Sequence, residues 1–183
     1  MVNWLQKVIT AGQKIKTAFH ERVTKEDIAK SDWTSCCKGP ILKKDLENNL
    51  FVCASCNKHH YISPTQRFDI MFGKNNWQKI DSPQPPPDPY NWQDTKKYTD
   101  RLKDAKKITG QDNAILSCEA KINDIDVVVS AVNFKFIGGS ISMAEGENVL
   151  ASIQVAINKK CPYIFISASG GMRMLTNMLS LMQ

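Results

Sequence analysis

Two pairs of cysteines constrain the front of this chain more than any other feature. Cys36 and Cys37 are adjacent, and Cys53 and Cys56 form a C-x-x-C motif after a gap of fifteen residues. Two pairs at this separation are typical of a four-cysteine zinc ribbon, in which each pair lies on a short turn and all four thiolates bind one tetrahedral ion. The sequence therefore predicts a small metal-stabilised module over residues 33–62.

The first pair departs from the usual pattern, since no residues separate its two cysteines. Adjacent side chains reach one common ion less easily than side chains on a C-x-x-C turn. His59 or His60, close behind the second pair, is an alternative fourth ligand that would give a Cys3His site. The spacing leaves open whether Cys36 and Cys37 both bind the ion.

The composition is that of a globular protein from a reducing compartment. Apolar residues make up 42% of the 183 residues, which is enough for a packed core. Cysteines spaced as metal ligands indicate a reducing compartment, so we expect a cytoplasmic protein. Lys7 interrupts the only early apolar stretch, so we expect no signal peptide, and no run is long enough for a membrane span. The net charge of +6 suits nucleic acid or a phosphate-bearing ligand, and an ordinary lysine-rich surface explains it equally well.

The middle of the chain is predicted to connect the cysteine module to a larger domain. Residues 1–32 are expected to form an N-terminal helical segment, and residues 63–112 a helical and proline-rich connector. In the connector, Ser63-Pro64 is a typical helix start and residues 82–92 are too rich in proline for helix or central strand. A charged helix is predicted from about Thr95 to Thr109, with Tyr98, Leu102 and Ala105 on its inner face.

Strands and helices are predicted to alternate from residue 113 onwards. Two β-rich runs, 114–122 and 125–136, are joined by Asn123-Asp124, a typical two-residue hairpin turn. A helix is expected to open at Gly138-Gly139-Ser140. Its predicted inner face consists of Val149, Ile153, Ala156 and Ile157.

One more strand and one more helix are predicted at the end of the chain. Residues 162–167 are too apolar to alternate, as expected of a strand covered on both sides, and a last helix is predicted over 172–181. This order of elements predicts an α/β layer over residues 113–183.

Two glycine pairs are the candidate chemical features of this layer, because no Ser/His/Asp or Cys/His set is evident. Gly138-Gly139 and Gly170-Gly171 each lie between a predicted strand and a predicted helix. Glycine lets a backbone approach a ligand closely, and a helix N-terminus favours a phosphate or a developing oxyanion. A tight turn without a ligand is the alternative, and neither pair matches a dinucleotide-binding or P-loop motif.

Several segments together carry a resemblance to a known family. They are Cys53–His60, Phe134–Ser140, Ser167–Met174 and Ser180–Gln183. With them the chain resembles, over nearly its whole length, the carboxyltransferase β subunits of bacterial acetyl-CoA carboxylase. The resemblance implies a zinc ribbon followed by the first part of a crotonase-like α/β domain.

The resemblance also implies a reaction and its partners. The family transfers a carboxyl group from carboxybiotin to acetyl-CoA, which gives malonyl-CoA for fatty-acid synthesis. The biotin carboxyl carrier protein supplies the carboxybiotin, biotin carboxylase charges it, and a related α subunit completes a heterotetramer. The β subunit is expected to hold the acetyl-CoA.

Site residues follow from the matching positions. Gly170 and Gly171 are expected to be catalytic through backbone N–H groups that stabilise an enolate oxygen. Arg173 is expected either to meet a CoA phosphate or to brace its loop through a carboxylate, and the bracing role is slightly favoured. The implied substrate-binding residues are Gly138, Gly139, Ser140 and Arg173, and the implied zinc ligands are Cys36, Cys37, Cys53 and Cys56.

Two further departures from the family pattern affect these expectations. After Ser140 the family tends to run Met-Gly-Ser-Val-Val-Gly, whereas this chain runs from Ile141 to Gly146 as Ile-Ser-Met-Ala-Glu-Gly. The gained carboxylate, Glu145, would repel CoA phosphates if it faced the pocket, or act as a favourable first-turn charge if it faced solvent. The family domain also continues beyond the match to Gln183, so a chain that ends there is expected to be inactive alone.

Two other functions stay open on the sequence alone. The basic cysteine module suits a nucleic-acid-binding role, with Phe51 and Tyr61 as its only nearby stacking aromatics. Alternatively, the chain is a non-catalytic partner that completes a complex. A related acyl-CoA, such as propionyl-CoA, is an alternative acceptor.

Overall fold

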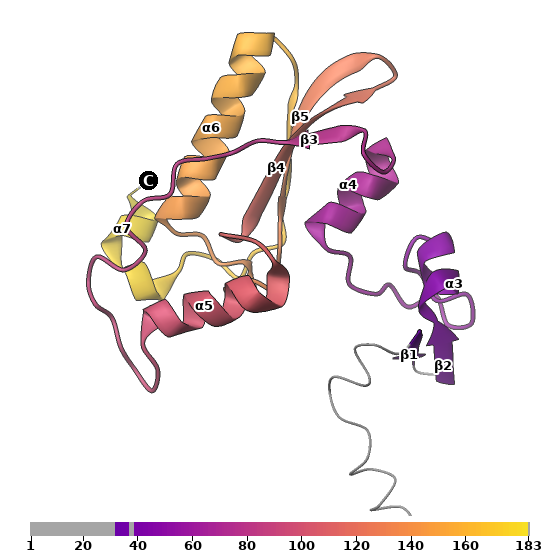
Figure 1. Cartoon of the computed structure of the whole chain (residues 1–183), viewed down its shortest axis with the longest axis horizontal. Helices are drawn as coiled ribbons and strands as arrows, with labels where there is room; N and C mark the ends of the chain where they lie inside the picture. Colours follow the sequence, from indigo (N-terminus) through magenta and orange to yellow (C-terminus); the bar gives the residue numbers. More distant parts are fainter. Residues whose placement is uncertain (1–31, 37–38, 183) are drawn as a thin grey trace, which may run out of the picture. The chain divides into compact units, whose positions relative to one another are not determined.

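The computed structural model describes residues 32–36 and 39–182, which divide into two compact units at Tyr61–Ile62. The predicted N-terminal helical segment therefore lies outside the described residues, apart from Asp32. In the first unit, β1 (Trp33–Cys36) and β2 (Gly39–Leu42) form an antiparallel hairpin that leads into α3 (Lys43–Asn48) (Figure 1).

The second unit contains a four-stranded mixed sheet in the order β3-β4-β5-β6. The predicted hairpin is confirmed, because β4 and β5 pair antiparallel and turn at Asn123 and Asp124, whose φ angles of 47° and 66° suit a two-residue hairpin turn. β6 pairs parallel to β5 at the edge of the sheet. The strands are β3 (Trp77–Lys79), β4 (Ile115–Ile122), β5 (Ile125–Val132) and β6 (Tyr163–Ile166).

Local sequence signals determine where the first helix of this unit begins and where the second one ends. Ser63 caps α4 (Pro64–Phe72) in a capping box with Gln66, as the Ser-Pro start predicts. Gly110, in the left-handed conformation, ends α5 (Tyr98–Thr109), and the predicted inner face of that helix is buried. The proline-rich segment before α5 forms neither helix nor strand over residues 82–92.

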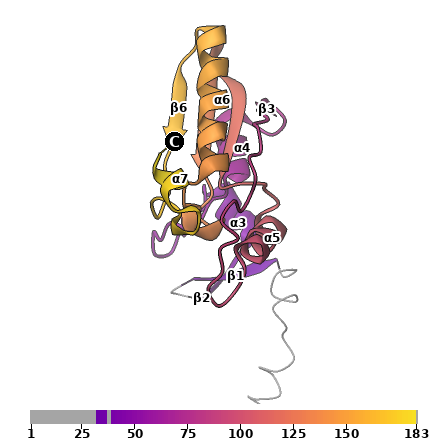
Figure 2. The same cartoon turned by 90° about the vertical axis from the view of Figure 1, so that its left-hand side faces the viewer.

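The sheet of the second unit is covered on both faces. Phe68 and Phe72 of α4 pack with alternate residues of β4 and β5, including Cys118 and Val129. The intervening residues, such as Ser117 and Ser130, face α6 (Met143–Lys159), which lies along the sheet in both views (Figures 1 and 2). This arrangement confirms the predicted α/β class.

The predicted inner face of α6 is only partly correct, because Ala156 is buried and Val149 and Ile153 are half-buried, whereas the most buried stripe lies elsewhere. Ile157 is 62% exposed, and the buried stripe is largely polar. Asn148 accounts for part of this, because its amide contacts Ser117 on β4 and donates to the Ile115 carbonyl at 3.2 Å. Apolar periodicity alone therefore did not identify the most buried side of α6, because hydrogen bonds to the strands help to determine which side faces the sheet. The buried residues of α6 are Glu145, Asn148, Ser152 and Ala156.

The predicted helix over 172–181 is also wrong in its extent. A 3-10 turn, η2 (Met174–Thr176), and one short helix, α7 (Met178–Leu181), replace it. Asn177 separates them with φ 49° and ψ −133°, which no helix accommodates. A second 3-10 turn, η1 (Ile137–Gly139), precedes α6.

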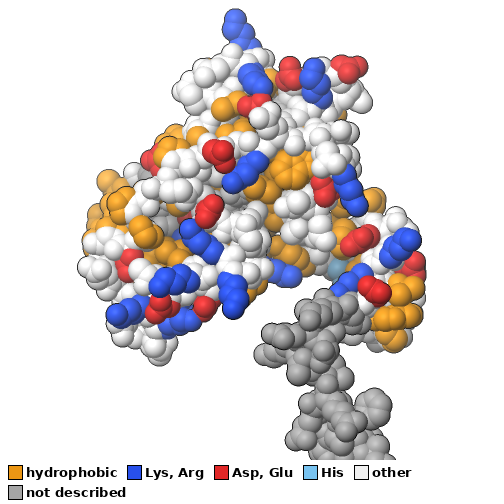
Figure 3. All heavy atoms as spheres, in the orientation of Figure 1, with side chains coloured by type: hydrophobic (Ala, Val, Ile, Leu, Met, Phe, Trp, Pro, Cys, Tyr) orange, Lys and Arg blue, Asp and Glu red, His pale blue; other side chains and the backbone are white. Residues whose placement is uncertain are grey.

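Charges on the surface of α5 are mixed, and both signs are visible in the space-filling view (Figure 3). Arg101 contacts both carboxylate oxygens of Asp94 at 2.6 and 2.7 Å, and Lys106 pairs with Asp112 at 3.1 Å. Exposed pairs of this kind contribute little to stability, which favours an ordinary solvated face. No helix within the described ranges is long and apolar enough to cross a membrane.

Candidate functional site: a cysteine cluster and two opposed glycine turns

Three of the four predicted metal ligands lie together in the first unit. The sulfur atoms of Cys36, Cys53 and Cys56 all lie within 4.8 Å of one another, and the Cys36 and Cys56 sulfurs are 3.3 Å apart. A Zn–S bond of about 2.3 Å in a tetrahedral site places sulfur atoms about 3.8 Å apart. The three thiols therefore fit three corners of one metal site.

The fourth corner is open to two candidates. Cys37 lies outside the described residues. Among the described residues the group contains no histidine, although His60 has a buried Nε2 atom without a hydrogen-bond partner. His59 is exposed and pairs with Val52 in an isolated β-bridge, which makes His60 the better of the two histidine candidates.

The two glycine pairs lie side by side in the second unit, although 32 residues separate them in the sequence. The Gly170 N–H donates to the Gly138 carbonyl at 2.9 Å, and the Ile141 N–H donates to the Gly171 carbonyl at 2.9 Å. The Arg173 N–H then donates to the Ile141 carbonyl at 2.7 Å. The turn after β5 and the turn after β6 are thus held in a fixed register by backbone hydrogen bonds.

Close approach of the two turns requires glycine at position 139. A Cβ atom there would lie 2.3 Å from the Ala168 carbonyl oxygen, and the φ angle of 64° is also unfavourable for other residues. Gly138 has a similar φ of 65°, but nothing lies within 4 Å of the equivalent Cβ position. Only the second glycine of this pair is therefore required by packing.

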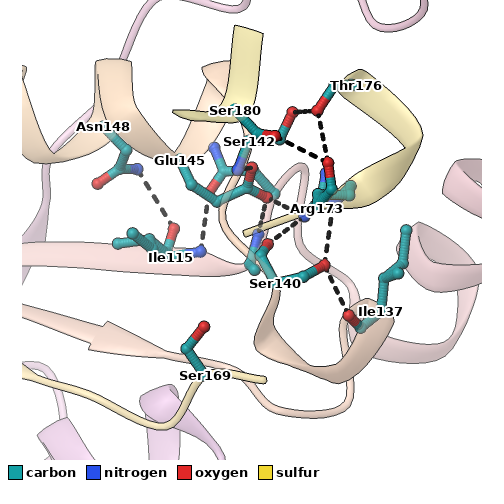
Figure 4. Close-up of polar contacts among 12 residues, drawn as sticks. Ile115, Ile137, Ser140, Ser142, Glu145, Asn148, Ser169, Arg173, Thr176 and Ser180 are labelled. Carbon is teal, nitrogen blue, oxygen red and sulfur yellow. Dashed lines mark hydrogen bonds and ion pairs between the residues drawn. The ribbon is translucent and has the colours of Figure 1, made fainter. Parts of the chain in front are cut away.

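The two predicted catalytic glycines differ in how their N–H groups are used. The Gly170 N–H is engaged by the Gly138 carbonyl, so it does not point to a ligand. The Gly171 N–H donates at 3.0 Å to the Ser169 hydroxyl, an exposed side chain that lies apart from the buried network in Figure 4. Gly171 is therefore the better candidate for an N–H donor to a substrate oxygen.

Arg173 braces the turns from inside the protein. Its side chain is only 3% exposed, and its guanidinium donates to the Ser140 carbonyl at 2.5 Å and the Ser140 hydroxyl at 3.0 Å. It also donates to the Tyr98 hydroxyl at 2.9 Å and lies over the Phe136 ring at 5.7 Å. The bracing role is the one that this geometry supports, and a direct contact with a CoA phosphate is not.

Glu145 occupies neither of the two positions expected for it. Its side chain is fully buried and forms an ion pair with Arg173 at 2.7 Å. Its carboxylate also accepts from the Ala114 N–H and from the Ser142 N–H, both at 2.9 Å (Figure 4). A buried carboxylate with these partners neither repels a ligand nor faces solvent, because the strands and α6 enclose it.

Tyr98 is a further member of this network, and the sequence did not indicate its contact with Arg173. Burial raises the pKa of its hydroxyl, and the nearby Arg173 only partly offsets that increase. The hydroxyl therefore stays protonated and accepts from the guanidinium. The one available signal was the apolar period of α5, which placed Tyr98 on the inner face without indicating its partner.

The chain is similar in sequence to curated proteins along its whole length. No family model matches it. The acetyl-coenzyme A carboxylase carboxyl transferase subunit beta of Pelagibacter ubique (strain HTCC1062) is 53% identical over 182 residues, which cover all of this chain and 59% of that protein. The protein of the same name from Beijerinckia indica subsp. indica is 38% identical over 184 residues, or 61% of its length. The chain thus spans about three fifths of the length of these curated relatives.

Solved structures show a more distant likeness. A transcarboxylase 12S structure has a TM-score of 0.48 and 17% identity, covering 66% of this chain and 21% of that one. The β subunit of geranyl-CoA carboxylase from P. aeruginosa has a TM-score of 0.44 and 19% identity, covering 72% and 23%. Because these scores lie below 0.5, the relationship is carried by the sequence relatives alone.

Proposed function

We propose that this chain, a homologue along its whole length of the β subunits of the acetyl-CoA carboxylase carboxyltransferase, forms the acetyl-CoA side of such an enzyme. The reaction is transfer of a carboxyl group from carboxybiotin to acetyl-CoA, which gives malonyl-CoA for fatty-acid synthesis. The proposed partners are the carboxyltransferase α subunit in a heterotetramer, the biotin carboxyl carrier protein and biotin carboxylase, in the cytoplasm. The domain is proposed to be the first part of a crotonase-like carboxyltransferase fold.

The register of the two glycine turns is the observation that carries this proposal. Loss of CO2 from carboxybiotin would free a biotin nitrogen that can accept a proton from the acetyl methyl group, and the resulting enolate carbon would attack that CO2. The enolate carries negative charge on the thioester oxygen, and a fixed N–H donor stabilises that charge. Gly171 is the proposed donor, since only an exposed hydroxyl engages its N–H. Gly170, Gly138, Gly139 and Ser140 hold the turn, and Arg173 braces it from the buried side.

For the first unit we propose a structural zinc ion. Cys36, Cys53 and Cys56 would bind it as thiolates, and Cys37 or His60 would complete the tetrahedron. When bound, the ion supplies folding energy to this unit and takes no part in carboxyl transfer. A role in nucleic-acid binding is the alternative for this unit.

A matched pair of glycine substitutions tests the proposed function. Gly171 and Gly110 both have positive φ angles, 109° and 68°, and nothing lies within 4 Å of either Cβ position. Valine therefore introduces backbone strain at both sites, more at 109° than in the left-handed region at 68°, but only Gly171 lies in the proposed site. We expect Gly171→Val to abolish malonyl-CoA formation, and Gly110→Val to retain it.

The measurement uses the protein produced from its native gene, its α subunit and the carboxylated carrier. If transfer survives Gly171→Val, the assignment of this turn is wrong. If the wild type shows no transfer but binds RNA or DNA with a steep dependence on salt, the nucleic-acid function replaces the one proposed.

A further inference from the structure

We propose that Glu145 is a positioning residue, which holds the two glycine turns in register through Arg173. Glu145 lies in the first turn of α6, and Arg173 directly follows the second glycine turn. The inference rests on the proposed function only where it concerns the rate of carboxyl transfer. The mechanical coupling between the turns is independent of that function.

The coupling passes through one guanidinium group. Arg173 Nη2 lies 2.7 Å from Glu145 Oε1 and 2.5 Å from the Ser140 carbonyl oxygen, and Nε lies 3.0 Å from the Ser140 hydroxyl. The backbone N–H of the same arginine donates to Ile141. Arg173 therefore contacts the first turn with both its backbone and its side chain, so its position sets the register of the second turn.

Glu145 is in turn fixed to the frame of the unit. One carboxylate oxygen accepts from the N–H of Ala114, which precedes β4, and the other from the N–H of Ser142, the residue before α6. The turn that Arg173 holds is exposed over residues 167–172, and apart from Arg173 its anchors are the backbone hydrogen bonds that Gly170 and Gly171 make to the first turn. The residues before β4 and α6 thus hold Glu145, Glu145 holds Arg173, and Arg173 holds the glycine turns.

The device involves two residues at which this chain departs from the pattern that the resemblance implies. The family pattern has valine in the part of the sequence where Glu145 stands, and a glycine where Ser142 stands. Both substituted residues belong to the same buried network, because the Ser142 hydroxyl lies 2.8 Å from the Thr176 hydroxyl while its backbone N–H binds Glu145 (Figure 4). The two departures that made this segment look atypical are therefore parts of one local arrangement.

Amide hydrogen exchange tests the coupling without any assay of activity. The probes are the N–H groups of Ile141, Gly170 and Arg173, which bond across the two turns. We expect Glu145→Gln to raise their exchange rates at least about tenfold, because the neutral amide no longer holds the buried guanidinium. The matched control is Glu147→Gln on the same helix, which lies outside the network and should leave these rates unchanged.

Carboxyl transfer in the complex with the α subunit tests the positioning role. For Glu145→Gln we expect kcat/KM for acetyl-CoA to fall by about 10- to 100-fold per folded molecule, because a small displacement of the reacting groups lowers the rate by that order. The control Glu147→Gln should match the wild type. A purely structural role would instead lower the folded fraction and leave the rate per folded molecule unchanged. Arg173→Lys should not preserve the register of the two turns, because an ammonium group cannot make the several directed hydrogen bonds of the planar guanidinium.

The outcomes separate the two proposals. Unchanged exchange at the three amides in Glu145→Gln would overturn the coupling, and faster exchange with an unchanged transfer rate would overturn the positioning role. A wild type without transfer activity would refute the proposed function, while the exchange rates would still decide the coupling. If Glu145→Gln does not fold, the double variant Glu145→Gln/Arg173→Met removes both buried charges, and the same exchange rates are read in it.

Discussion

Cys118 shows at the scale of one residue how the packed sheet controls chemistry. Its side chain lies in the middle of β4, fully buried against the α4 face of the sheet. Burial, with a smaller effect from the neighbouring Glu119 charge, raises the pKa of its thiol from 9.0 to about 12. The thiolate is the reactive form of cysteine, so this residue is a structural one.

We therefore expect Cys118 to resist alkylation in the folded protein. At pH 8, iodoacetamide should leave it unmodified until urea unfolds the chain, as site-resolved mass spectrometry would detect. The same shift lowers stability at alkaline pH, because an unfolded chain releases the proton above pH 9 and the folded chain only near pH 12. Cys118→Ala should reduce the loss of stability between these values, and rapid alkylation of the native protein would contradict this account.

At the scale of an element, the turn between β5 and α6 depends on two glycines for different reasons. In Gly138→Ala the new side chain has free space, and only the positive φ angle is unfavourable, so the substitution should lower the free energy of unfolding by about 1 kcal/mol. Gly139→Ala also forces the Ala168 carbonyl away, and should cost about 1–3 kcal/mol more. Urea unfolding of the two variants measures the difference, and equal losses would mean that the two turns do not approach as closely as described.

The elements that the sequence predicted well are those with a local cause. The Asn123-Asp124 turn, the Ser63 cap and the Gly110 stop each act within a few residues, and each is confirmed. The inner face of α6 could not be predicted in this way, because Asn148 is buried through contacts with strand residues about thirty positions earlier. The same holds for the Glu145–Arg173 pair, whose members become neighbours only in the folded unit.

At the scale of the whole molecule, the two units differ in what stabilises them. The second unit has three clusters of buried apolar side chains. Among the described residues of the first unit, only Leu46 and Cys53 are buried. The buried core formed by these described residues is too small to stabilise a fold without a further constraint, which the proposed zinc ion would supply.

Removal of metal should therefore unfold the first unit selectively. After treatment with a chelator, we expect proteolysis within residues 39–61, while the amides of β4 and β5 stay protected from exchange. Cys53→Ser should reproduce this effect, and Cys161→Ser in the second unit should not. Metal content of Cys37→Ser and His60→Gln identifies the fourth ligand, and protection from proteolysis that persists without metal would refute a structural ion.

The buried ion pair also imposes an order on synthesis. Glu145 and Arg173 are separated by 28 residues, which a ribosome adds in roughly 1–6 s at its usual speed. During that interval the carboxylate has no cation to accompany it into the interior, and an unpaired buried charge is strongly unfavourable. The first turn of α6 is therefore expected to stay hydrated until Arg173 is available, so this part of the unit closes on a growing chain only after that residue has been added.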